Sequence, residues 1–327
     1  MSGDGGLRIL VNPAEIDAEV GPAFLTRCFG TRWTEAMYRW YLQRAFDGEL
    51  PDRLVLMNGA RAVAAFGVVY RQLRTQDEEM HRVGVAVAGA TLPSARGRGY
   101  YARVLQAAVE RSAARGCAAL LGFVTVGNSS GRGLLRLGAI TVPSAYIVSR
   151  DRPSHSQIGT LQLHEAKVAE DWPVRAAARR RAAAAPAGFH YPDTGAWWSQ
   201  MVNRPHGVHC VRIGASCRAV IESVGDTDRL QWLDGDVRER LAAIRAIVAR
   251  ARCRRRKFFM FSTCPHEAAG ARRLGLQRIP DTCSRWRCNP GTRPPCATGQ
   301  TCPGACSRET GCRCVSGQGL LWAIRRK

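Results

Sequence analysis

Short apolar runs separated by polar turns dominate the first 150 residues. The runs at 54–57 and 62–70 flank an Asn58-Gly59 pair, which is typical of the tight turn of a β-hairpin. Residues 83–90 are uncharged and compatible with a strand, and the apolar positions in the next segment, 104–112, recur at helical spacing. Strands that alternate with helices in this way predict a mixed α/β (α+β) fold.

An aromatic segment at 33–42 precedes the hairpin and follows a strand-like run at 7–11 and a helix-like stretch at 15–25. Its aromatic residues, which include Trp40 and Tyr41, fall on an amphipathic pattern. Large aromatic side chains at such spacing more often fill a core than line a ligand site. We therefore expect a first strand and helix, followed by a second helical segment packed on the sheet.

The pattern of the first half recurs in the second half, in a shorter and less complete copy. Trp40 precedes Arg61 by the same interval that separates Trp197 from Arg218. The later elements also correspond: the helix 104–114 with 241–251, the strand 120–126 with 257–263, and 136–138 with 273–275. The offset between the copies shrinks from 157 to 137, so the second copy lacks about twenty residues in its middle. Chance similarity between helices rich in Ala and Arg is the alternative.

The stretch with the clearest ligand chemistry lies between the strand-like run and the helix of the first copy. A glycine-bearing turn at the start of a helix leaves backbone N–H groups unpaired at the positive end of the helix dipole, where they can hold a phosphate. Gly97 and Gly99 remove side chains that would keep a phosphate away, and Arg96 and Arg98 supply positive charge. The stretch reads Thr91-Leu92-Pro93-Ser94-Ala95-Arg96-Gly97-Arg98-Gly99-Tyr100-Tyr101.

This turn resembles the Arg/Gln-x-x-Gly-x-Gly/Ala pyrophosphate loop of the GNAT superfamily of N-acyltransferases, read here from Arg96 to Tyr101. The resemblance implies a mixed central sheet flanked by helices, with acetyl-CoA or another acyl-CoA as the co-substrate. It also implies a primary amine of a small molecule as the acceptor, with Trp40 and Tyr41 beside it. By the same resemblance the CoA contacts comprise Thr91, Leu92, Arg96, Gly97, Arg98, Gly99, Tyr100, Tyr101 and Asn128.

Two positions depart from the pattern of that family. Tyr101 stands where the loop usually has Gly or Ala, and Leu134 stands where a tyrosine often protonates the departing thiolate. Glu79 and His81 are the titratable residues nearest in sequence to the reaction centre, and either is a candidate general base. A backbone N–H near Thr91 or Leu92 is the candidate for polarising the thioester carbonyl. An acyl-CoA-sensing protein that has lost its chemistry is the alternative.

The second copy has a different sequence at the position of the loop. Residues 233–238 read Leu-Asp-Gly-Asp-Val-Arg, which offers no diphosphate cradle and adds repelling carboxylates. We therefore expect a GNAT-like N-acetyltransferase domain at 8–150 and a degenerate GNAT-like domain at 157–282.

The net charge of +22 is compatible with anionic ligands such as CoA. Of the 48 basic residues only Lys167, Lys257 and Lys327 are lysine, and the arginines are spread along the chain rather than gathered on one element. Nucleic-acid binding is therefore the less favoured alternative. The sequence has no apolar run of membrane-spanning length and no signal-peptide layout at its start, so we expect a cytoplasmic protein without a membrane partner. The oligomeric state stays open.

Seven of the 13 cysteines lie in residues 283–327. Cys302 and Cys306 have a spacing compatible with zinc, but Cys312 and Cys314 are too close, and seven ligands do not divide into complete four-coordinate sites. The segment also lacks apolar periodicity. We expect a disordered tail and no metal site, with a zinc module as the alternative.

Overall fold

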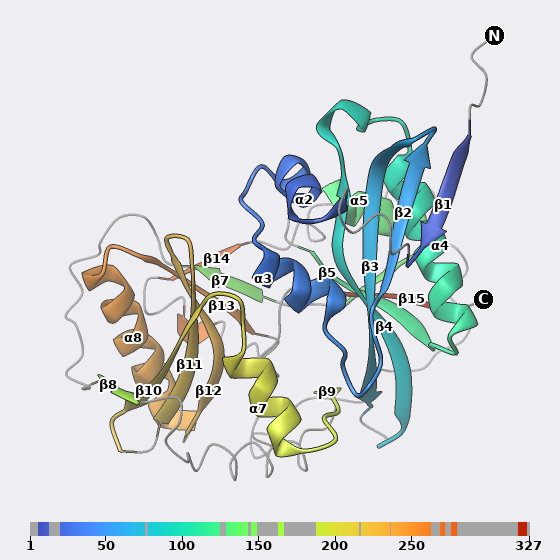
Figure 1. The fold of residues 1–327 in the computed structure, drawn as a ribbon. Helices are drawn as coiled ribbons and strands as arrows, with labels where there is room; N and C mark the ends of the chain where they lie inside the picture. The colour runs from blue at the N-terminus through green and yellow to red at the C-terminus, as the bar shows by residue number, and fades with distance from the viewer. Residues whose placement is uncertain are drawn as a thin grey trace, which may run out of the picture.

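The computed structural model contains two mixed β-sheets, each with its own helices, that form two lobes (Figure 1). It describes residues 6–12, 20–75, 78–124, 129–142, 145–148, 163–166, 188–215, 217–235, 237–262, 269–271, 276–279 and 320–325. In the first lobe the strand order is β1-β2-β3-β4-β5-β15-β6, with β9 paired to β3. In the second lobe it is β14-β7-β13-β12-β11-β10-β8.

The first lobe is built mainly from the first 142 residues. β1 to β4 form an antiparallel meander, and β5 then pairs in parallel with β4 after a crossover through α4. Its elements are β1 (Leu7–Val11), α2 (Pro22–Phe29), α3 (Glu35–Tyr38), the π-helical segment η2 (Arg39–Gln43), β2 (Asp52–Asn58), β3 (Arg61–Arg74), β4 (Met80–Thr91), the 3-10 turn η3 (Pro93–Ala95), α4 (Tyr100–Ala114), β5 (Ala119–Val124), α5 (Ser129–Arg136) and β6 (Ile140–Val142).

The second lobe repeats this plan. β10, β11 and β12 form an antiparallel meander, and β13 pairs in parallel with β12 after a crossover through α8. The expected correspondence of helix with helix and strand with strand is therefore seen in the sheet topology. The remaining elements are β7 (Ala145–Val148), β8 (Leu163–Ala166), β9 (Gly188–Phe189), α7 (Thr194–Val202), β10 (Gly207–Ile213), β11 (Cys217–Val224), β12 (Thr227–Asp234), α8 (Val237–Cys253), β13 (Lys257–Ser262), β14 (Gln277–Ile279) and β15 (Leu320–Arg325).

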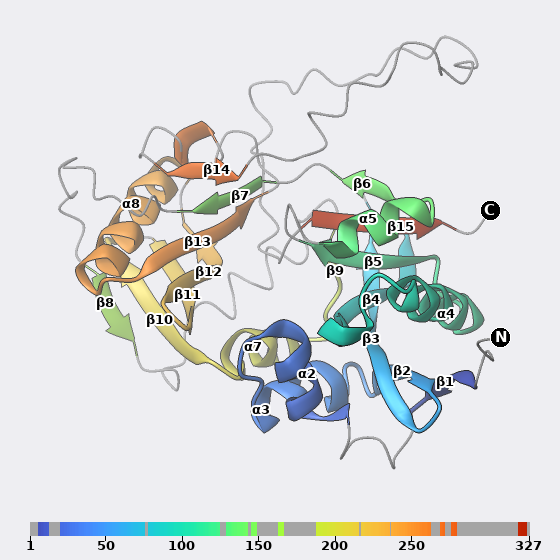
Figure 2. The ribbon, with the colours of Figure 1, turned by 90° about the horizontal axis from the view of Figure 1, so that it is seen from above.

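The two sheets exchange a strand. β15, from the end of the chain, lies between β5 and β6 of the first sheet, and β7, which follows β6 directly, pairs with β13 and β14 of the second (Figure 2). The expected domain limits at 150 and 157 follow the sequence repeat, whereas the hydrogen-bonded sheets cross them. Within the segment expected to be a disordered tail, Leu320–Arg325 forms β15, which pairs with β5 and β6 of the first sheet. Residues 283–319 lie outside the described residues.

Each lobe has its own apolar core between a sheet and its crossover helix. In the first, Phe24, Leu25 and Leu105 are fully buried, and in the second Ile244 and Phe258 are. No helix in the described part of the chain is long and apolar enough to cross a membrane.

A buried carboxylate holds β2, β3 and α4 together in the first lobe. Asp52 is fully buried and accepts hydrogen bonds from Tyr70 (2.7 Å), Arg111 (2.7 Å) and Arg115 (3.0 Å). Burial alone would raise the pKa of Asp52, but the hydrogen bonds from Arg111, Tyr70 and Asn12 outweigh it and lower the pKa to about 2. The carboxylate is therefore charged in the folded protein.

Candidate functional site

The turn before α4 has the geometry of an open anion cradle. Gly97 and Gly99 have φ values of 78° and 75°, in the left-handed region that favours glycine, and both are exposed. A Cβ added at either would meet nothing within 4 Å, so these glycines set the backbone path and leave the space outside the turn open. Gly99 is the N-cap of α4, and no side chain caps the first turn. The N-cap residue, being a glycine, therefore supplies no side-chain acceptor to the first N–H groups of the helix.

The residues around the turn have different roles from one another. Arg96 donates from Nη2 to the Cys28 carbonyl (2.6 Å), which ties the turn to α2. Tyr100 is almost fully buried, and its hydroxyl accepts a hydrogen bond from the Asn58 side chain (3.4 Å). Arg98 is exposed at the turn. Arg96 and Tyr100 therefore position the cradle, and Arg98 is the cation at its surface.

β4 and β5 separate next to this cradle. They are paired only from Val83 to Ala86 on β4. Beyond that point β4 bulges at Ala88 and Gly89, two residues that lie opposite Phe66 alone. Ala88 has a φ of 50°, a strained value for a residue with a side chain. Near the cradle, the edge of β4 that faces β5 is therefore without a strand partner among the described residues.

The backbone at the end of β4 offers one of the two predicted N–H donors to this gap. Leu92 N–H donates to the Val63 carbonyl (3.0 Å) and is not available for a ligand. Pairs in an antiparallel ladder alternate between bonded and non-bonded, so the next pair, Thr91 with Ala64, is non-bonded and Thr91 N–H points away from β3 towards β5. The Thr91 hydroxyl is buried without a hydrogen-bond partner.

Tyr101 fills space beside the gap. Its ring lies 3.2 Å from the position that a Cβ of Gly89 would occupy and 3.2 Å from that of Gly133 on α5, and it contacts Phe66 with a centroid distance of 6.1 Å. The departure from a small residue at position 101 is thus accommodated by glycines on two neighbouring elements.

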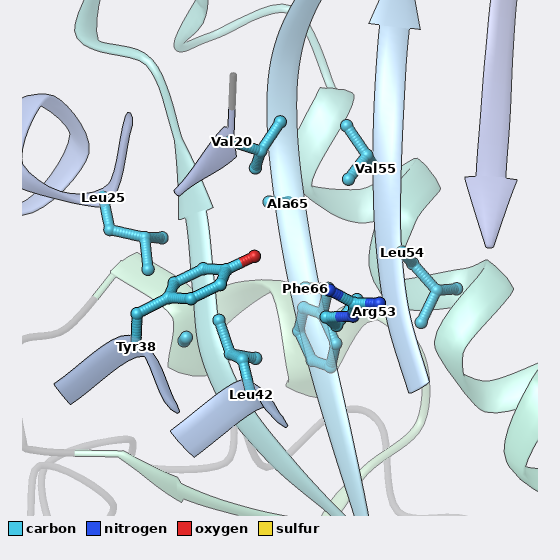
Figure 3. Close-up of a pocket in the computed structure, with 10 residues that line it drawn as sticks. Val20, Leu25, Tyr38, Leu42, Arg53, Leu54, Val55, Ala65 and Phe66 are labelled. Carbon is cyan, nitrogen blue, oxygen red and sulfur yellow. The ribbon is translucent and has the colours of Figure 1, made fainter. Parts of the chain in front are cut away.

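A small, mainly apolar pocket lies against β2, β3 and β4, with α2, α3 and η2 around it (Figure 3). Leu42 of η2 packs over Gly67 of β3 so closely that any side chain at position 67 would clash with it. The pocket reaches the bulge at Ala88, so a ligand there would lie next to the point where β4 is irregular. The lining residues are Val20, Leu25, Tyr38, Leu42, Arg53, Leu54, Val55, Ala65, Phe66 and Ala88.

The other predicted site residues do not join this group. Glu79 Oε2 lies 3.2 Å from His81 Nε2 at the start of β4; Glu79 is exposed and His81 is half-buried. His81 is ten residues before Thr91 on the same strand, which is about 30 Å at the rise of a strand. Leu134 is buried in the first core, and Asn128 lies outside the described residues. Sequence reasoning missed the bulge and the pocket, although Gly67 and Gly89 inside strands were available signals.

In the second lobe, the described residue nearest to the equivalent helix start shows no comparable opening. Gly235, just before α8, has a φ of 131°, and a Cβ there would lie 2.5 Å from Cys217 Sγ and 3.0 Å from its Cα. This glycine therefore serves close packing of the turn on β11. β12 has the same place in the second sheet as β4 has in the first, and it too is bulged, at Gln231. Here, however, Gln231 Nε2 donates to buried Glu222 (2.7 Å).

No group of three or more His, Cys, Asp or Glu side chains in the described ranges is arranged to hold a metal ion.

Comparisons with known proteins agree with this geometry. No family model matches the chain, and no curated protein matches it at a significant level of sequence similarity. Among solved structures it is similar to a tandem GNAT protein from the clavulanic acid biosynthesis pathway, with a TM-score of 0.56 and 13% identity over 84% of this chain and 96% of that one.

Two further solved structures are GCN5-related N-acetyltransferases. The one from Anabaena variabilis gives a TM-score of 0.54 and 13% identity over 79% of this chain and 66% of that one. The one from Kribbella flavida gives 0.51 and 15% over 80% and 65%. The chain thus spans slightly less than two thirds of the length of these two proteins.

The two mixed sheets, the bulged fourth strands and these similarities define the fold as that of the GNAT superfamily. More particularly, the chain has two GNAT-like lobes in tandem; among the described residues the space outside the glycine turn is open before α4, whereas Gly235 before α8 lies close to Cys217.

Proposed function

We propose that the protein is an acyl-CoA-dependent N-acyltransferase that transfers an acetyl or other acyl group to a primary amine of a small molecule. The observation that carries this proposal is the uncapped start of α4, where an exposed glycine turn lies beside the gap between β4 and β5. The acyltransferase fold of its structural neighbours supports the same chemistry.

The chain's own groups have distinct tasks in this proposal. The first N–H groups of α4, with Arg98 beside them, bind the diphosphate of the donor. Thr91 N–H, which faces the gap, donates to the thioester carbonyl oxygen as negative charge develops there. The donor itself supplies the activated acyl group. The acceptor amine approaches from the apolar pocket, which meets β4 at Ala88 and so brings the two reactants to one point of the strand.

Replacing Gly99 by glutamate tests the donor site. A carboxylate in the cradle would repel the diphosphate and occupy its space, so we expect acetyl-CoA binding, measured by calorimetry, to be lost. Gly116→Glu is the matched control, because Gly116 ends the turn after the same helix with a φ of 76° and nothing within 4 Å of its added Cβ. Equal affinity in the wild type and in Gly99→Glu would overturn the proposal.

Acyl-CoA sensing without catalysis is the second candidate. It is favoured by buried Leu134 at the position of the usual acid and by the Tyr101 ring beside the gap. Thiol release from acetyl-CoA, measured over a panel of primary amines, separates the two functions. Amine-dependent release supports the transferase, and tight acetyl-CoA binding without release for any amine supports the sensor.

A further inference from the structure

The end of η2 in the first lobe is in contact with α7 of the second, and both ribbon views draw α7 on the side of the second lobe that faces the first (Figures 1 and 2). Arg44, directly after η2, donates from Nη2 to the Gln200 side chain on α7 (2.7 Å). Close by, β9 pairs with the end of β3, and Phe189 and Tyr191 lie against Arg71. Residues from both halves of the chain thus surround one small region.

Aromatic rings hold two arginines of this region by their faces. Arg44 lies over Trp40, with its Cζ 3.4 Å from the ring centroid, and Arg71 lies over Phe46 at 3.5 Å. Phe189 and Tyr191 are each 4.8 Å from Arg71 Cζ. Stacking fixes the plane of a guanidinium but uses none of its N–H groups, which point outward from its edge.

Several of those N–H groups are buried without an acceptor. The Nε atoms of Arg44, Arg71 and Arg204 have no hydrogen-bond partner, and neither has Arg71 Nη2. The Arg204 side chain is 91% buried, since its exposed fraction is 9%. A buried donor without an acceptor lowers stability by about 1–3 kcal/mol, so this set of donors favours any ligand that can accept from them.

The region also has an excess of positive charge, which favours an anionic ligand. Burial, together with the nearby charges of Arg71 and Arg204, lowers the pKa of Arg44 to about 10, so both of these cations lie within electrostatic reach of Arg44. Glu222 pairs with Arg204 (3.2 Å) and is the carboxylate that the structure places here among the described residues. It offsets one of the three charges.

We propose that Arg44, Arg71 and Arg204 form a binding site for an anionic group, a carboxylate or a phosphate. Planar guanidinium edges match both groups through paired N–H···O contacts. η2 links this site to the pocket, because Leu42 lines the pocket and Arg44 follows two residues later. If the protein acts as proposed above, the acceptor is therefore an amine that carries an anionic group; the anion site itself does not depend on that function.

Calorimetry with inorganic phosphate and with succinate tests the site at constant ionic strength, with chloride as the balancing anion. The titrations are made in the Gly99→Glu protein, so that the α4 cradle does not contribute. We expect saturable binding of at least one anion, weakened tenfold or more by Arg71→Gln. Arg245→Gln, which removes an exposed arginine of α8, is the matched control and leaves the affinity unchanged.

Preference for phosphate indicates a phosphorylated acceptor, and preference for succinate indicates a carboxylated one. Absence of binding to both anions, or equal weakening by Arg71→Gln and Arg245→Gln, overturns the proposal. If Arg71→Gln does not fold, Arg71→Lys retains the charge and removes the planar fork, and the same tenfold weakening is expected.

A kinetic comparison separates this inference from the proposed function. Arg71→Gln should raise KM for anionic amines tenfold or more, leave KM for neutral amines unchanged and leave acetyl-CoA affinity unchanged. A loss of acetyl-CoA binding in Arg71→Gln would contradict the anion site. A donor site that survives Gly99→Glu would overturn the transferase and leave the anion titrations valid.

Discussion

The starts of α4 and α8 are equivalent points of the two lobes, and they use glycine in opposite ways. At α4 the glycines are exposed and face open space, whereas Gly235 before α8 is pressed against Cys217. The first turn leaves the space outside its glycines open, and in the second turn Gly235 has Cys217 where a side chain would lie. A fold can thus keep its strand, turn and crossover helix while one copy loses the opening that would bind a ligand.

The bulged fourth strands differ in the same sense. In the first lobe the bulge at Ala88 borders an apolar pocket, and in the second the bulge at Gln231 is closed by its hydrogen bond to Glu222. The bulge is therefore a property of the fold, and the presence of a pocket depends on the side chains around it.

The largest effect that this comparison predicts is on the number of acetyl-CoA molecules bound per chain. Because only the first lobe has an open cradle, we expect one acetyl-CoA per chain in equilibrium dialysis and none in Gly99→Glu. Two sites in the wild type, or one remaining in Gly99→Glu, would show that the second lobe binds the donor as well.

Removing the buried carboxylate of the first lobe should have the next largest effect. Asp52→Ala leaves Arg111, Arg115 and Tyr70 without their shared acceptor, and the loss of one partner of a buried ion pair costs about 3–5 kcal/mol. Urea unfolding measures the change in the free energy of unfolding. Asp226→Ala in the second lobe is the control, since its pair with Lys257 is exposed and little change is expected.

Alanine at the two helix starts compares the lobes directly. Gly235→Ala adds strain at a positive φ and a contact with Cys217, for a loss of about 3 kcal/mol in all. Gly99→Ala adds the backbone strain alone, about 1 kcal/mol. Thermal unfolding of both variants checks the order, and equal losses would mean that the turn before α8 can relax away from β11.

A smaller effect than that of Asp52→Ala is a pH dependence that arises in the first lobe. The folded pKa of Asp52, about 2, lies below the ordinary aspartate value of 3.8, so its contribution is present above about pH 4 and is lost as the pH falls towards 2. A shift of this size corresponds to about 2 kcal/mol. The free energy of unfolding, measured between about pH 5 and about pH 2.5, should fall less steeply in Asp52→Asn than in the wild type. Parallel curves would contradict the assignment.

Local patterns predicted much of the fold. The Asn58-Gly59 hairpin, the helix after the glycine turn and the tandem repeat all follow from residues close in sequence. Sequence proximity did not place the two candidate general bases at the site. Glu79 and His81 are close to Thr91 in sequence, but the length of the extended strand β4 lies between them and Thr91. Whether Thr91 N–H or Leu92 N–H faces the gap depends on the register in which β4 pairs with β3, and the sequence of β4 alone does not specify that register. The arginines between the lobes come from distant segments, and no local pattern joins them.

The strand exchange sets an order on the folding of this protein during its synthesis. β5 and β6 emerge from the ribosome within the first 142 residues, but β15, which lies between them, is made only with residues 320–325. Pairing across such a sequence distance is slow, and strand edges that wait for a partner are prone to association. The first lobe, which holds the open cradle, thus completes its sheet only after residues 320–325 have been translated.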